Sequence, residues 1–81
     1  MAWTQEAIMF DVNVVSENRV RHYSIGRATE VGWEAKLEEN HSVRWKETYE
    51  DWHRVERTLT RMKQEVSDLL DQGWTISTAS R

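Results

Sequence analysis

The sequence predicts an α+β fold: an antiparallel four-stranded meander covered on one face by a single long C-terminal helix, with an optional short fifth strand at residues 74–77. Apolar and polar residues alternate through the first half of the chain, which is the period of a strand. In the second half apolar residues recur every three or four positions, which is the period of a helix. The 81 residues suffice for one small core, so we expect residues 1–81 to form a single domain.

The first two strands are expected within residues 8–27, joined by a three-residue loop at residues 16–18. The apolar residues that share one face of the first strand are Ile8, Phe10, Val12 and Val14. With a three-residue loop, the same face of the second strand carries His22 and Ser24, and Tyr23 points to the opposite, outer face.

The third strand has the clearest alternation in the chain. Its inward residues are Val31, Trp33, Ala35 and Leu37. A two-residue turn at residues 28–29 is expected before it. After it, a loop at residues 39–41 leads to a fourth strand at residues 42–47, whose Val43 and Trp45 would face the core.

Residues 48–51 have the Thr-x-x-Asp spacing of a helix capping box, and a helix of about 23 residues is expected to follow and to end at Gly73. Its apolar stripe consists of Trp52, Val55, Leu59, Met62, Val66 and Leu69. The alternation resumes at residues 74–77, where a short fifth strand would lie beside the first strand and antiparallel to it.

Composition excludes several classes of function. Without cysteine the chain has no disulfide, thiolate catalysis or cysteine-bound zinc, and the net charge of −3 speaks against a generally basic nucleic-acid binder. No apolar run approaches the ~20 residues of a membrane span, so we expect a cytoplasmic protein. The spacing of the histidines, serines and glycines fits no catalytic, metal-binding or phosphate-binding motif. We therefore expect neither an enzyme nor a cofactor.

The leading interpretation is a non-catalytic binding or interaction protein that acts as a small homodimer. Apolar residues on the outer sheet face, which would otherwise meet water, indicate a second chain. The residues expected at this interface are Met9, Val15 and Ile25.

A first alternative is a pocket for an apolar or cationic small molecule between sheet and helix. Five tryptophans in so short a chain suggest it, because aromatic rings line many such pockets. The expected lining is His22, Ser24, Trp33, Trp45 and Trp52.

A second alternative is weak binding of single-stranded nucleic acid on the outer sheet face. Cations around an exposed aromatic ring are one way in which an open sheet holds such strands. The residues expected to do so are Arg19, Arg21, Tyr23, Arg27, Lys36, Arg44 and Lys46.

Overall fold

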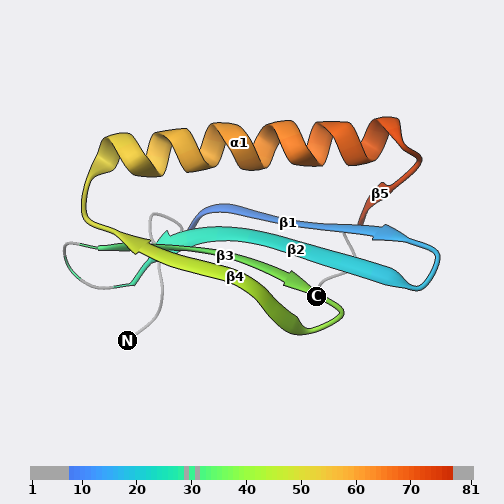
Figure 1. Cartoon of the computed structure of the whole chain (residues 1–81), viewed down its shortest axis with the longest axis horizontal. Coiled ribbons are helices and arrows are strands. Elements are labelled where there is room, and N and C mark those ends of the chain that lie inside the picture. Colours follow the sequence, from blue (N-terminus) through green and yellow to red (C-terminus); the bar gives the residue numbers. More distant parts are fainter. Residues whose placement is uncertain (1–7, 29, 31, 78–81) are drawn as a thin grey trace.

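The chain folds into a five-stranded antiparallel sheet with one helix packed across one face (Figure 1). This computed structural model describes residues 8–28, 30 and 32–77. Its elements are β1 (Ile8–Ser16), β2 (Arg19–Arg27), β3 (Trp33–Glu39), β4 (Ser42–Tyr49), α1 (Trp52–Asp71) and β5 (Thr75–Ser77). The strand order is β4-β3-β2-β1-β5, with β5 antiparallel to β1. The predicted α+β fold and its fifth strand are therefore confirmed.

The first hairpin differs from the prediction by one residue in its loop. The turn consists of Glu17 and Asn18 alone, because Ser16 pairs with Arg19, and Glu17 takes a left-handed φ of 54°. A slip of one residue in register moves every side chain of a strand to the other face. The predicted orientation of the whole of β2 is therefore wrong.

In the observed register Tyr23 and Ile25 of β2 face the helix, and each is only 1% exposed. Ile25 lies opposite Phe10 of β1 and Ala35 of β3. His22 and Ser24, the next positions along the strand, consequently lie on the outer face.

The connections around β3 also differ from the prediction. Arg27 pairs with Trp33, so β3 begins later than expected and the predicted two-residue turn at residues 28–29 is wrong. Part of that connection, including Val31, lies outside the described residues. At the other end of β3 the turn is Asn40-His41, with φ values of 52° and 70°, rather than a three-residue loop.

Strand β4 extends to Tyr49 and contains a bulge. Glu38 pairs with Val43 and Leu37 with Trp45, which leaves Arg44 as the extra residue. Trp45 packs on the core as predicted, whereas Val43 shares the outer side with Glu38 and is 54% exposed. The prediction that Val43 faces the core is wrong because it did not include the bulge.

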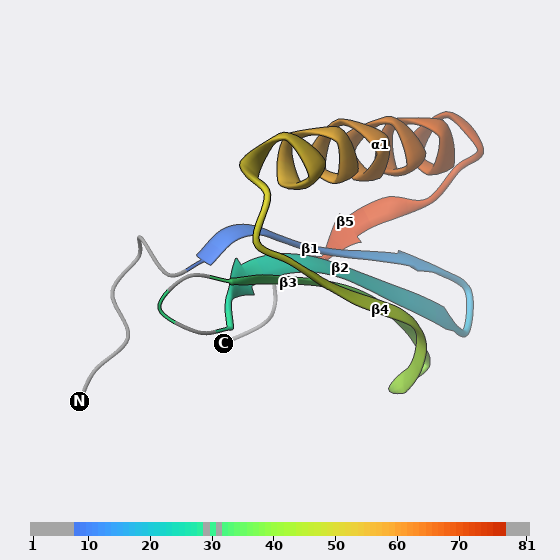
Figure 2. The same cartoon turned by 60° about the vertical axis from the view of Figure 1, so that its left-hand side comes forward.

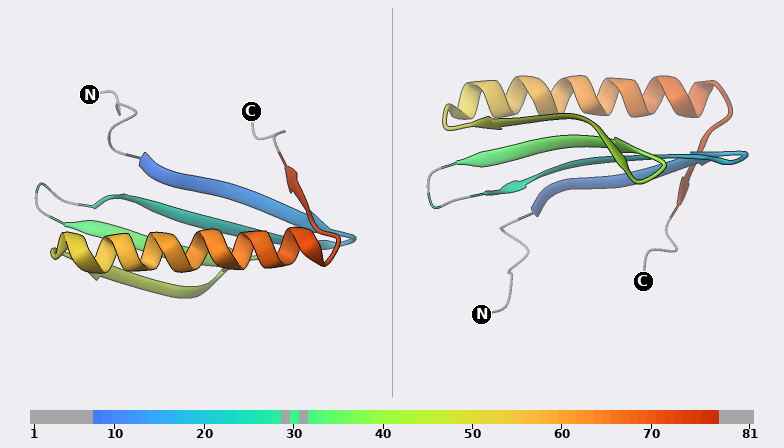
Figure 3. Two further views of the ribbon diagram at one scale, coloured as in Figure 1. Left: turned by 90° about the horizontal axis from the view of Figure 1, so that it is seen from above. Right: turned by 60° about the horizontal axis from the view of Figure 1, so that its bottom comes forward.

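Helix α1 runs along the helix-facing side of the sheet, over β3 and between β4 and β1 (Figures 2 and 3). It begins after Asp51, whose carboxylate accepts a hydrogen bond from the His53 backbone N–H at 2.9 Å, so the capping residue is not Thr48. It ends as predicted at Gly73, in a Schellman motif whose backbone N–H of Trp74 donates to the Leu69 carbonyl.

The core lies between α1 and the centre of the sheet. Its buried apolar residues are Val14, Tyr23, Ile25, Ala35, Val55, Met62, Val66, Leu69 and Trp74. Four of these, Val55, Met62, Val66 and Leu69, belong to the predicted helical stripe. Leu59 of that stripe is partly buried and Trp52 is exposed. The helix therefore presents the expected face to the sheet.

Candidate functional site

The five residues expected to line a tryptophan pocket do not come together. Trp33 and Trp45 lie on the helix-facing side as predicted, and Trp52 packs against Trp33 with ring centroids 5.4 Å apart while staying 46% exposed. His22 and Ser24 lie on the opposite face of the sheet because of the shifted register of β2. The prediction that they share a pocket with the tryptophans is wrong.

His22 instead joins three strands on the outer face. Its Nε2 lies 2.7 Å from an Asp11 oxygen on β1, and its Nδ1 lies 3.0 Å from a Glu38 oxygen on β3. Only an imidazolium can donate to both carboxylates at once. The two nitrogens point to opposite sides of the ring, so the three side chains do not converge on a common ligand. We interpret this cluster as a structural link between strands.

The predicted nucleic-acid platform is divided between the two faces of the sheet. Arg19, Arg21 and Arg27 lie with Tyr23 on the helix-facing side, and Lys36 and Lys46 pair with each other across the outer side. Arg44 occupies the exposed bulge of β4. Buried as it is, the Tyr23 ring cannot stack on a base. The prediction that these seven residues share one surface is wrong.

The three residues expected at a dimer interface are separated as well. Ile25 is buried under the helix, and Met9 packs against the core beside an irregularity in β1. Only Val15, opposite Val20, remains on the outer face as predicted. The predicted apolar outer patch is therefore wrong for two of its three members.

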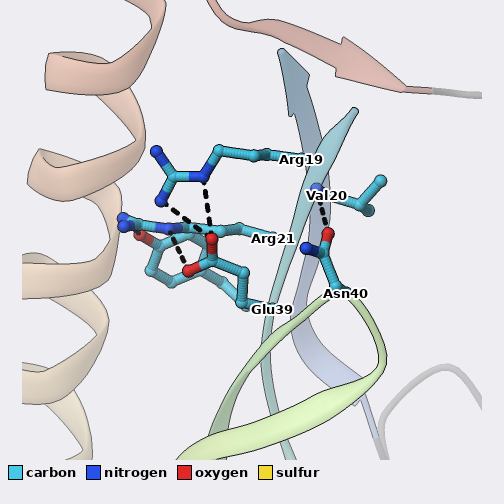
Figure 4. Close-up of polar contacts among 6 residues, drawn as sticks. Arg19, Val20, Arg21, Glu39 and Asn40 are labelled. Atoms are coloured by element: carbon cyan, nitrogen blue, oxygen red, sulfur yellow. Dashed lines mark hydrogen bonds and ion pairs between the residues drawn. The ribbon is translucent and has the colours of Figure 1, made fainter. Parts of the chain in front are cut away.

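Two arginines of β2 form a charged clamp beneath the end of the helix. The guanidinium groups of Arg19 and Arg21 contact the Glu39 carboxylate at 2.8 and 3.3 Å (Figure 4). Both also lie over the Trp74 ring, at 5.2 and 5.5 Å from its centroid. The hydrogen bond from Arg19 and the charges of both arginines hold the pKa of Glu39 below its usual range. These arginines are occupied within the fold.

Beside this clamp, the buried hydroxyl of Tyr23 connects the clamp to the helix. Arg21 donates to it at 3.4 Å, and Glu65 of α1 lies close enough to interact with it. Burial raises the pKa of Tyr23, and the negative charge of Glu65 raises it further. The phenol is therefore held neutral in the ordinary pH range and serves as a hydrogen-bonding group.

A groove between β4 and α1 has one wall on the sheet and one on the helix. It has a volume of about 890 Å³, with Glu47 and Tyr49 on the strand side and Arg54, Arg57 and Arg61 on the helix side. We call it the β4–α1 groove. A further hollow of about 550 Å³ adjoins it and shares Tyr49 and Arg54. Together the two follow the second half of β4.

A smaller hollow, the inner pocket, opens beside the groove under the helix. It measures about 360 Å³ and is lined by Tyr23, Leu37, Trp45, Arg61, Met62 and Glu65. Arg61 belongs to both hollows, and its guanidinium lies 5.2 Å from the centroid of Trp45. Of the predicted pocket residues only Trp45 lines this space.

The arginines of the groove differ from those of the clamp in having no carboxylate partner among the described residues. Within residues 8–28, 30 and 32–77, no carboxylate lies within ion-pair distance of Arg54, Arg57 or Arg61. They are not among the binding residues predicted from the sequence, although their spacing of three and four residues places them along one flank of a helix. That spacing was the available signal.

Strand β4 forms one border of the sheet, so one side of its backbone faces no other strand among the described residues. All of its residues except Trp45 and Tyr49 are exposed. Lys46 and the inward-facing Glu47 are charges of the kind that protect an edge from indiscriminate pairing. The opposite border is formed by the three-residue β5 and the first half of β1.

Comparison with known proteins leaves the interpretation to this geometry. The chain matches no protein family, no curated protein and no solved structure. In the part of the chain that the structure describes, no helix is both long and apolar enough to cross a membrane.

Proposed function

We propose that this protein is a non-catalytic interaction module that binds an extended polypeptide segment as an additional strand on β4. The observation that carries the proposal is the placement of an open edge strand directly along a groove whose other wall is a helix. An added strand satisfies the free backbone N–H and carbonyl groups of the edge. Its alternate side chains would enter the β4–α1 groove.

A second copy of this chain is a less favourable occupant of the same edge. A two-fold pairing of β4 with β4 keeps both helices on one side of the joined sheet and turns the two grooves toward each other. The three arginines of each groove, Arg54, Arg57 and Arg61, outnumber its carboxylates Glu47 and Glu56, so two facing grooves would bring like charges together, which is repulsive. Homodimerisation, the interaction expected from the sequence, would need another surface.

The test uses nuclear magnetic resonance on the ¹⁵N-labelled protein and a blocked eight-residue probe peptide. In the probe, threonine and glutamate alternate and one central glutamate is replaced by phenylalanine. We expect saturable shifts and slowed amide exchange in β4. N-methylation of alternate residues provides the control, since it should abolish binding on one edge of the peptide and spare it on the other. Shifts confined to other elements, or equal binding of both methylated peptides, would contradict strand addition.

Binding of a small molecule in the inner pocket is a second proposal, supported by the apolar surfaces of Leu37, Trp45 and Met62. The Arg61 guanidinium already lies over the Trp45 ring, which favours a neutral apolar ligand over a cationic one. Titration with toluene, followed on the Met62 methyl resonance, should produce a saturable ring-current shift. An unchanged Met62 resonance at saturating toluene would exclude this proposal.

A further inference from the structure

We infer that the β4–α1 groove selects acidic strands, and that one large apolar side chain of the bound segment enters the inner pocket. This inference rests on the proposed function and names the chemistry of its partner. It depends on three features of the described residues: the arginine flank of α1, the state of the nearby carboxylates, and the apolar floor of the pocket.

The arginine flank provides the anion-binding groups. Arg54 and Arg57 line the groove and have no carboxylate partner in the part of the chain that the structure describes, whereas the two clamp arginines of β2 are engaged by Glu39. A guanidinium group presents several N–H donors in a planar fork that matches a carboxylate. Carboxylates on the inward side of an added strand would supply the missing partner for each.

The carboxylates already present in the groove leave these arginines available. Glu47 accepts a hydrogen bond from the Tyr49 hydroxyl at 3.0 Å, and Glu56 faces His53 at 3.8 Å. On the outer side of the same edge, Lys46 lies directly opposite Lys36. Like charges directly opposite on neighbouring strands repel each other, and an acidic residue on the next strand relieves that repulsion.

The inner pocket provides a site for an anchor residue. Its floor is formed by Leu37, Trp45 and Met62, and Arg61 links it to the groove. Trp45 is one of the inward residues of β4, so the pocket adjoins the edge on which the segment would pair. Large apolar side chains in such central pockets contribute much of the affinity of many interfaces.

A nucleic-acid strand also carries negative charge, but the geometry favours a polypeptide. The free N–H and carbonyl groups along β4 match a second peptide backbone and have no regular counterpart in a sugar–phosphate chain. Tyr23, the aromatic residue that would have stacked on a base, is buried. An oligonucleotide is therefore a comparison ligand in the test.

The experiment compares the acidic probe with an amide probe in which every glutamate is glutamine, using the intact protein at low salt. We expect the acidic probe to bind at least tenfold more tightly. The variant Arg54→Gln/Arg57→Gln should lose about tenfold for the acidic probe, as expected for two exposed ion pairs, and little for the amide probe. Lys63→Gln is the matched control, because Lys63 is an exposed cation of α1 outside the groove lining. Replacing the phenylalanine of the acidic probe by alanine should weaken its binding to the parent protein by about tenfold.

The outcomes separate this inference from the proposed function. Equal binding of both probes on β4, or equal losses in the arginine and Lys63 variants, would overturn acidic selection while strand addition stands. If the alanine probe bound as tightly as the phenylalanine probe, the inner pocket would not hold an anchoring side chain, and that part of the inference would be wrong. If neither probe perturbs β4, both proposals fall. Tighter binding of single-stranded oligothymidylate, with loss in the arginine variant, would assign the groove to nucleic acid and overturn the inference.

Discussion

The orientation of β2 can be tested by removing neighbouring side chains from its two faces. Ile25 is 1% exposed beneath α1, whereas Ser24 lies on the outer face opposite Asp11 and Lys36. Truncating a buried isoleucine to alanine typically costs ~2–5 kcal/mol, and we expect about 3 kcal/mol for Ile25→Ala. Ser24→Ala should change the free energy of unfolding by less than about 0.5 kcal/mol.

A loss of that size is large for this chain, since domains of this length have unfolding free energies of only ~4–12 kcal/mol. Urea unfolding followed by tryptophan fluorescence provides the measurement. With an m-value of roughly 1 kcal/mol/M, Ile25→Ala should lower the midpoint by about 2–3 M while m stays unchanged. The opposite ranking, with Ser24→Ala costing more than Ile25→Ala, would refute the two-residue turn and restore the register with a three-residue loop.

Three further substitutions test local features of the fold. Gly73→Ala should lower the free energy of unfolding by about 1 kcal/mol in urea titrations, because φ is 105° there, while the added Cβ meets no described atom within 4 Å. His41→Gly should raise it by about 0.5–1 kcal/mol, because it creates the Asn-Gly turn that suits two left-handed residues; a loss would contradict the turn geometry. Glu39→Gln tests how stability responds to acid. Arg19 lowers the folded-state pKa of Glu39, so the stabilising contribution of the Glu39 carboxylate is present above its ordinary pKa and is lost as the pH falls through the lowered pKa. The variant should therefore lose less stability between pH 7 and pH 3 than the parent protein.

The fold class was predictable because it depends on the periodicity of apolar residues, which a wrongly predicted loop length does not change. The alternation in the first half and the spacing from Val55 to Leu69 specify strands and a helix whatever the loops do. Gly73 marks the helix end by its conformational freedom, and the pattern after it predicts the fifth strand. Each of these features depends only on residues close together in the chain, so a single sequence is enough to predict it.

The orientation of β2 was not predictable in the same way. It depends on whether the chain turns in two residues or three, and Glu17, a residue with little preference for a left-handed φ, occupies the first turn position. The alternation of apolar and polar residues also gives no sign of the bulge that turns Val43 outward. Tertiary packing outweighs local propensity in both places: that of Tyr23 and Ile25 in β2, and that of Trp45 beside the bulge in β4.

The register of β2 also decides which cations are left for a partner. Had Arg19 and Arg21 faced outward, the sheet would have carried a basic surface and α1 would have packed over His22 and Ser24. Facing the helix, these arginines are held by Glu39 and by the Trp74 ring, which makes them part of the fold. Among the described residues, Arg54, Arg57 and Arg61 on the flank of α1 have no carboxylate within ion-pair distance, and they lie beside the open strand β4. A single turn residue thus shifts the candidate site from the sheet face to its edge.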